Sequence, residues 1–195
     1  MARDAAPFSE IASLVPTWSG PSWLTDARKA AIARFASAGL PTTRLEAWRT
    51  TPLPDLGTKA FFPGFASTVN KAKAAVAPFS AGDPITLVFV DGFHSVTLSS
   101  SEAAWPKGLR LAPMSRLLAM KPEDLRPWFA NRGEDEGAMH DLNTAAFRDG
   151  AFVVVEDGVQ VPLEVRVVVV STSTEQPVAQ HVRNLVHVGR GLVFG

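Results

Sequence analysis

Four histidines, His94, His140, His181 and His187, are the side chains of this sequence with the most versatile chemistry. Neutral imidazole is a common metal ligand, and it titrates near neutral pH. His181 and His187 have even spacing, so on one unbroken strand they would share a face and form a metal pair. Because their segment contains no Asp, Glu or Cys, two polar positions on a strand surface are the favoured interpretation.

Other residue patterns give even weaker evidence for a catalytic site. His140 and Asp141 are adjacent in an expected helix, where neighbouring side chains point in different directions. The sequence has no G-x-x-x-x-G-K-[ST] loop and no G-x-S-x-G elbow, and Gly189-Arg190-Gly191 favours a turn over a phosphate cradle. Four aspartates stand in turns or caps, where Asp is expected for backbone reasons: Asp83, Asp91, Asp141 and Asp149. We therefore predict no catalytic, cofactor-binding or metal-binding residue, and no enzymatic activity.

Composition restricts the partners and the compartment. The 19 basic and 19 acidic side chains balance, which argues against a nucleic-acid partner. Cysteine is absent, so disulfides and thiolate ligands are excluded. No apolar run approaches the roughly 20 residues of a membrane helix, and no N-terminal signal segment is visible. These features predict a cytoplasmic protein that binds neither nucleic acid nor membrane.

Helices are expected at the start of the chain, where they would position any site. A short helix is predicted over residues 8–15. A second helix, capped by Thr25 or Asp26, is predicted to run to about Ala38. Gly39 tolerates the left-handed geometry of a helix end, and Pro41 prevents continuation.

A meander and a hairpin follow. Four prolines between 50 and 81 predict an extended, ordered meander with apolar anchors. Ile85–Val90, the dipeptide Asp91-Gly92 and the alternating stretch 93–98 predict a β-hairpin with a two-residue turn.

The second half changes from helix to strand. A strand at 109–113 and helical turns at 114–120 and 125–129 lead to a helix from Glu136 to Phe147, capped by Asp135. Strands are then predicted at 151–155, 163–170 and 178–188. The lack of helices between them excludes a doubly wound sheet and allows a sandwich, a barrel or a β-helix. The chain stops inside a strand signal, which indicates a fragment of a longer protein.

The polar–aromatic cluster after the first long helix contains Arg44, Glu46, Trp48 and Arg49. Trp and Arg are enriched in binding hot spots, which would make this cluster a docking epitope. The favoured alternative is structural, with Trp48 filling a core gap while Arg44 and Glu46 pair locally.

Three stretches carry a resemblance to a known family. They are Gly39-Leu40-Pro41-Thr42-Thr43-Arg44 with Glu46-Ala47-Trp48-Arg49, then Phe89-Val90-Asp91-Gly92, then Asp141-Leu142-Asn143 through Asp149-Gly150-Ala151. Their types, order and separation resemble the N-terminal part of SufD-type proteins in the SufB/SufD family of iron–sulfur cluster assembly. The matching residues are interpreted as structural: Gly39, Pro41, Arg44, Glu46, Trp48, Asp91, Gly92, Asn143, Asp149 and Gly150.

The resemblance implies a fold and a role. The fold is α+β, with an N-terminal α+β region at 1–135 and, at 136–195, a linking helix and the first rungs of a right-handed parallel β-helix. The role is that of a non-catalytic scaffold subunit in a complex with SufB-like and SufC-like proteins, which this chain would contact through a missing C-terminal half. The complex, and not this fragment, would handle the cluster. A homodimer remains open.

Two other functions are weighed against the scaffold. The strand-rich tail is compatible with a β-helix carbohydrate-active enzyme, although no secretion signal is visible. His181 and His187 are compatible with a metal-binding module.

Overall fold

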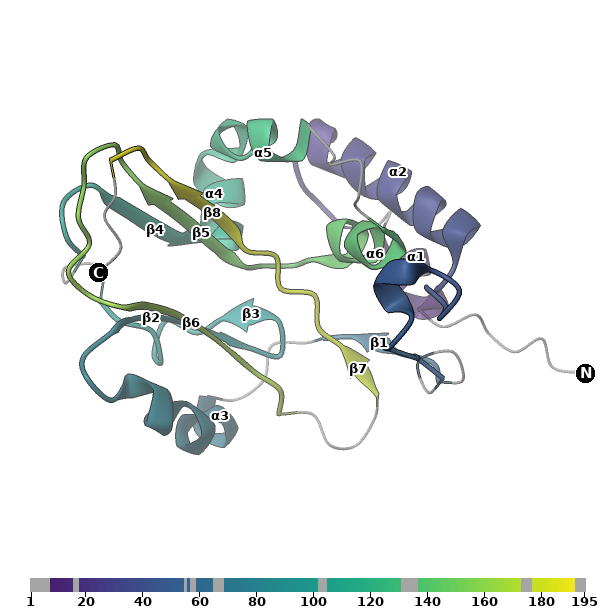
Figure 1. Cartoon of the computed structure of the whole chain (residues 1–195), viewed down its shortest axis with the longest axis horizontal. Helices are drawn as coiled ribbons and strands as arrows, with labels where there is room; N and C mark the ends of the chain where they lie inside the picture. The colour runs from purple at the N-terminus through teal and green to yellow at the C-terminus, as the bar shows by residue number, and fades with distance from the viewer. Residues whose placement is uncertain are drawn as a thin grey trace, which may run out of the picture. The chain divides into compact units, whose positions relative to one another are not determined.

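The structure is a computed structural model that describes residues 8–15, 18–54, 56, 59–64, 69–101, 105–130, 137–172 and 177–191. Helices are combined with small sheets, which confirms the α+β class (Figure 1). The right-handed β-helix and the division at residue 135 stay predictions. Two compact units form from interleaved segments of the chain. Unit 1 is Met1–Gly64, Pro122–Phe147 and Ser173–Ala179, and unit 2 is Phe65–Lys121, Arg148–Thr172 and Gln180–Gly195.

Unit 1 is mainly helical. Its elements are α1 (Ser9–Leu14), α2 (Ser22–Ala38), the 3-10 turn η2 (Glu46–Trp48), β1 (Phe62–Pro63), the 3-10 turn η6 (Pro122–Asp124), α5 (Arg126–Ala130), α6 (Ala138–Ala146) and β7 (Val178–Ala179). Strands β1 and β7 pair in parallel. Buried apolar side chains of the α1 segment, α2 and α6 form one core: Phe8, Ile11, Val15, Ala31, Phe35, Leu142, Ala145 and Ala146.

Helix α2 ends as predicted but begins earlier. Gly39 takes a φ of 69° at its C-terminal end, a value that favours glycine. The predicted caps Thr25 and Asp26 are wrong, because the helix starts at Ser22. The carbonyl of Pro21 accepts the backbone N–H groups of Leu24 and Thr25 at 3.0 and 3.1 Å, so the first turn closes around Pro21.

Unit 2 contains the two three-stranded sheets. Its elements are α3 (Val69–Val76), the 3-10 turn η4 (Ala77–Ser80), β2 (Ile85–Val90), β3 (Phe93–His94), β4 (Leu109–Pro113), α4 (Met114–Met120), β5 (Ala151–Val155), β6 (Val165–Val170) and β8 (Leu185–Val188). The strand orders are β3-β2-β6 and β4-β5-β8. Figure 1 shows β6 beside β2 and β8 beside β5, and both pairs are parallel.

A shared apolar core joins the two sheets of unit 2. Its buried members come from β2, β4 and β5: Ile85, Leu87, Phe89, Leu109, Leu111, Ala151, Val153 and Val155. Helix α3 covers the other face of β2 and β6 through Ala72 and Val76. Strand β2 is therefore buried at all six positions. In β6, Val167 contacts the first core and Val168 the second, so both faces are covered there, whereas Val169 is 49% exposed.

The predicted hairpin forms only next to its turn. Phe89 pairs with His94 and Val90 with Phe93, but the predicted strand at 93–98 is wrong beyond His94. After it the chain turns, and the hydroxyls of Ser99 and Ser100 accept hydrogen bonds from backbone N–H groups of β2. Side-chain oxygens thus take the place of a continuing partner strand.

Three further elements differ from their predictions. The meander at 50–81 contains helix α3, because Ala72 and Val76 are four residues apart and bury one face. The strand predicted at 178–188 is split into β7 and β8, with an isolated bridge at Val182 between them. Helix α6 begins at Ala138 with Gly137 as its cap. The predicted cap Asp135 and start Glu136 lie outside the described residues.

Candidate functional site

Asp149 connects three parts of unit 2 through its buried carboxylate. The side chain is 2% exposed. One oxygen accepts the backbone N–H groups of Ser115 and Gly150 at 2.9 and 2.8 Å. The other accepts the backbone N–H of His94 at 3.0 Å and the hydroxyl of Ser115 at 2.8 Å. These four hydrogen bonds fix the starts of α4 and β5 relative to the hairpin.

Gly150 lies against a later segment of unit 2. A Cβ atom at this position would be 1.7 Å from the carbonyl oxygen of Arg183, a separation that no side chain can take. The carbonyl of Asp149 accepts the N–H of Arg183 at 3.1 Å, and the side-chain oxygen of Asn184 accepts the N–H of Ala151 at 2.9 Å. These contacts set the register in which β8 lies beside β5.

Asp91 and Gly92 form the turn of the hairpin. Their φ angles are 50° and 90°, as a two-residue hairpin turn of the primed type requires. The Asp91 carboxylate also accepts the N–H of Thr172 at 2.7 Å, the Thr172 hydroxyl, and the side-chain amide of Gln180 at 2.9 Å. The turn residue therefore also holds two later segments of unit 2.

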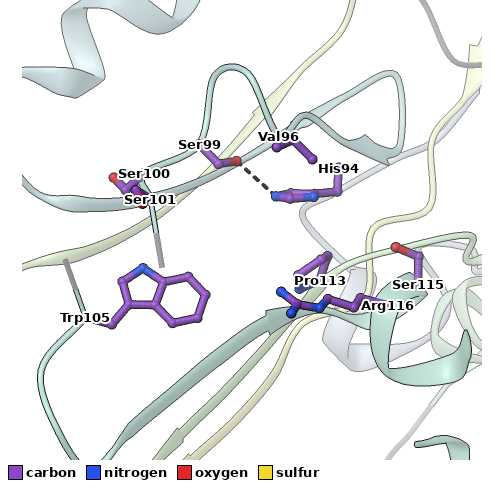
Figure 2. Close-up of a pocket in the computed structure, with 9 residues that line it drawn as sticks. All are labelled: His94, Val96, Ser99, Ser100, Ser101, Trp105, Pro113, Ser115 and Arg116. Atoms are coloured by element: carbon purple, nitrogen blue, oxygen red, sulfur yellow. Dashed lines mark hydrogen bonds between the residues drawn. The ribbon is translucent and has the colours of Figure 1, made fainter. Parts of the chain in front are cut away.

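A cavity of about 680 Å³ lies next to the Asp149 network (Figure 2). Trp105, Pro113 and Val96 supply apolar walls, and Arg116 and His94 supply the titratable groups. In Figure 2 the guanidinium of Arg116 points towards the indole ring of Trp105, and the imidazole of His94 lies on the opposite wall from Arg116. The arrangement can hold a small molecule with apolar and charged parts.

Hydrogen bonds define the state of His94. The Ser99 hydroxyl accepts the N–H of Val88 at 3.0 Å, lies 2.7 Å from the carbonyl of Ser95 and 3.1 Å from Nε2 of His94. Because the hydroxyl donates its single proton to that carbonyl, Nε2 of His94 must be the donor towards it. Burial lowers the pKa of His94, the Asp149 carboxylate raises it, and Arg116 lowers it. The net effect is a pKa of His94 below its ordinary value, which favours the neutral imidazole.

The stretch from Gly39 to Arg49 is arranged differently from its prediction. Pro41 is buried and Trp48 is half-buried, whereas Arg44 is exposed. The predicted pair of Arg44 and Glu46 is wrong, since Glu46 pairs with Arg49 at 3.7 Å and both are largely exposed. Several residues of this stretch line a second cavity, of about 530 Å³, in unit 1.

Comparison with known proteins now adds to these observations. The family model described as the SufBD protein N-terminal region matches residues 8–167. The chain belongs to the SufBD family. An iron–sulfur cluster assembly SufBD family protein of Synechocystis sp. is 24% identical over 165 residues, which are 85% of this chain and 36% of that protein. The chain therefore spans about a third of the length of this curated relative.

Within this SufBD chain, the motif residues differ in their surroundings. Asp91, Asp149 and Gly150 make the buried contacts described above, and Asn143 lies half-buried in α6. These contacts agree with the interpretation of the motif residues as structural. That these residues have no further role in the function of the protein stays a prediction. Spacing in the sequence had no signal for the cavity, because its described walls come from β3, the turn after it, the segment before β4 that carries Trp105, β4 and α4.

The histidine pair does not have the geometry that the metal hypothesis required. His181 lies outside any strand and is mostly buried, which lowers its pKa to about 4, whereas His187 is exposed on β8. The unbroken strand that would have put both on one face is absent from 178–188. Among the described residues of the SufBD chain, no group of three or more His, Cys, Asp or Glu could hold a metal ion.

Two arginines of unit 1 were missed by the sequence analysis. Arg28 is 5% exposed, donates to the carbonyl of Phe147 at 2.8 Å, and lies over the rings of Trp18 and Phe147. Arg34 pairs with buried Asp141 at 2.8 Å. Nothing in the sequence of α2 distinguishes Arg28 and Arg34 from surface arginines, so only their contacts in the folded chain reveal their role. In the described part of this SufBD chain, no helix is both long and apolar enough to cross a membrane.

Proposed function

We propose that this chain is the N-terminal part of a SufD-like, non-catalytic scaffold subunit that supports iron–sulfur cluster assembly. The observation that carries the proposal is the family match, which extends over residues 8–167. The name of the Synechocystis relative gives iron–sulfur cluster assembly as the role of that protein. The family assignment favours this role over a carbohydrate-active enzyme. A cytoplasmic location is part of the proposal.

The strand arrangement of unit 2 supports a continuation into a parallel β-helix. Strand β8 lies beside β5 in parallel register, and the chain between them contains no described helix. Among the described strands, β8 and β6 are edge strands, and each carries exposed valines: Val169, Val186 and Val188. Further strands of a longer protein would cover these valines and pair with these edges.

The partners in this proposal are a SufB-like protein and a SufC-like ATPase. Segments beyond this chain would supply their binding surfaces, since the relative is much longer. The chain itself would contribute the close backbone contact at Asp149 and Gly150, which sets the register of the parallel strands β5 and β8. No nucleotide or metal is assigned to its own residues.

The test is co-purification of the intact gene product with the SufB-like and SufC-like proteins of the same cell. We expect a stable complex of all three, detected by size-exclusion chromatography with light scattering. An Arg49→Gln variant, altered only at an exposed pair, is the matched control and should assemble equally well. A gene product that is folded yet binds neither protein would contradict the proposal.

A further inference from the structure

Sulfur occurs in this chain only as the thioether of methionine, because the sequence has four methionines and no cysteine. Three of these methionines lie in the part of the chain that the structure describes: Met114 and Met120 on α4, and Met139 on α6. A thioether carries no proton, and peroxides convert it to the sulfoxide. The rate of this reaction depends on whether the oxidant can reach the sulfur atom.

The two methionines of α4 differ completely in exposure. Met114 is 0% exposed, whereas Met120 is 67% exposed. They stand six positions apart in one helix, which places them about 120° apart around its axis. The backbone N–H of Met114 donates to the carbonyl of Gly150 at 2.7 Å and fixes the start of the helix. One side chain of the same type therefore faces the interior of unit 2 and the other faces water.

Met120 is the last residue of α4, and its backbone is held by the end of the helix. The N–H of Lys121 donates to the carbonyl of Leu117 at 2.7 Å and closes the last turn. An oxygen added to the exposed sulfur of Met120 would lie in water, so oxidation there breaks no core contact. The same oxygen on Met114 would be a buried polar atom, and Met139 packs against the core of unit 1.

We propose that Met120 is a site of reversible oxidation by peroxides. The sulfur lone pair attacks one peroxide oxygen, the O–O bond breaks, and the proton of the attacked oxygen passes to the leaving hydroxide, which departs as water. The sulfur is oxidised and the peroxide is reduced by two electrons each. Methionine sulfoxide reductases reverse the change, and the exposure of Met120 gives them access. The inference does not depend on the scaffold function.

The experiment treats the full chain with hydrogen peroxide and follows tryptic peptides by mass spectrometry over time. Trypsin places Met114, Met120 and Met139 on separate peptides, residues 111–116, 117–132 and 133–148, because it does not cut before proline. We expect Met120 to gain one oxygen at least about tenfold faster than Met114, and faster than Met139. Oxidation of Met120 no faster than that of Met114 would overturn the proposal.

Variants and repair test the site further. Met120→Leu should remove the fast uptake of oxygen, and the matched control Met139→Leu should keep it, since Leu and Met have similar volumes. With Met120 alone oxidised, the midpoint of urea unfolding should stay unchanged, and the two stereospecific methionine sulfoxide reductases should together restore the original mass. A lowered midpoint, or a sulfoxide that both enzymes leave in place, would refute a reversible surface site.

Discussion

The two compact units differ in the charge of the buried side chains that bond to the backbone in the contacts described above. In unit 1, the guanidinium of Arg28 is 5% exposed and donates to the backbone carbonyl of Phe147. In unit 2, the carboxylates of Asp91 and Asp149 are 3% and 2% exposed and accept backbone N–H groups. Unit 1 also buries the carboxylate of Asp141, which is 2% exposed and pairs with the side chain of Arg34.

The difference follows from the backbone groups that each architecture leaves unpaired. Phe147 stands at the C-terminal end of α6, where helices have carbonyls without intrahelical partners and a negative dipole end. A buried cation suits this place. In unit 2, turns and the starts of α4 and β5 present N–H groups, and a carboxylate with several accepting sites suits them. For Arg28, Asp91 and Asp149, the sign of the buried charge thus matches the backbone groups that it bonds.

The largest effect is expected from Gly150→Ala, which breaks unit 2 at the point where Asp149 holds it. The new methyl group would overlap the carbonyl of Arg183, so the two segments must separate. We expect the free energy of unfolding to fall by about 4 kcal/mol or more. Denaturant titration measures it. Gly137→Ala meets no atom within 4 Å and should cost under about 1 kcal/mol, so equal losses would contradict this explanation.

Replacing each buried aspartate of unit 2 with asparagine compares how much the two carboxylates contribute to stability. Both carboxylate oxygens of Asp149 accept hydrogen bonds from backbone N–H groups or a hydroxyl. In asparagine, one of these oxygens is replaced by an NH₂ group, which cannot accept them. Asp149→Asn should therefore cost about 3 to 4 kcal/mol of unfolding free energy. Asp91→Asn should cost less, because the Thr172 hydroxyl can turn and accept from the new amide. The reverse order in a thermal or urea titration would disprove the role given to Thr172.

His181 tests whether unit 2 disfavours buried cations. Burial lowers its pKa from 6.5 to about 4, so the unfolded chain takes up a proton more readily than the folded one. Its contribution to stability is complete above pH 6.5, falls as the pH drops from 6.5 to about 4, and then changes no further. The loss amounts to about 3 kcal/mol. His181→Gln should remove this part of the pH dependence in urea titrations between pH 4 and 7; an unchanged slope would be inconsistent with it.

Arg28 provides the corresponding test in unit 1. Arg28→Met keeps most of the side-chain volume but removes the donor to Phe147 and the contacts with the two aromatic rings. We expect a loss of about 2 kcal/mol in the free energy of unfolding. Arg28→Lys should lose less, since a charge remains near the helix end. A more stable Arg28→Met variant would show that burying the ion is a net cost.

The smallest effect is expected at the exposed pair of Glu46 and Arg49. Their separation is 3.7 Å and both side chains are mostly in water. Arg49→Gln should change the free energy of unfolding by less than about 0.5 kcal/mol. A loss comparable to that of Arg28→Met would mean that exposure does not govern the difference between these arginines.

Local chemistry was predictable where one short segment determines it. Gly39 ends α2 with a positive φ, and Asp91 and Gly92 form the hairpin turn, as expected from their residue types. The strand at 109–113 and the helix at 114–120 also appear as predicted. Helix α3 was not predicted, because the surrounding prolines favour an extended chain and the buried face of the helix consists only of Ala72 and Val76.

The family and the α+β class can be inferred from the sequence alone, because motif order, turn residues and capping glycines are local properties of the chain. Only the tertiary structure decided that Asp149 faces His94 and Ser115, that Arg28 reaches Phe147, and that Trp105 and Arg116 line one cavity. The physical reason is that backbone donors and acceptors choose their partners after distant segments have come together. A sequence records that these side chains exist, but not what they satisfy.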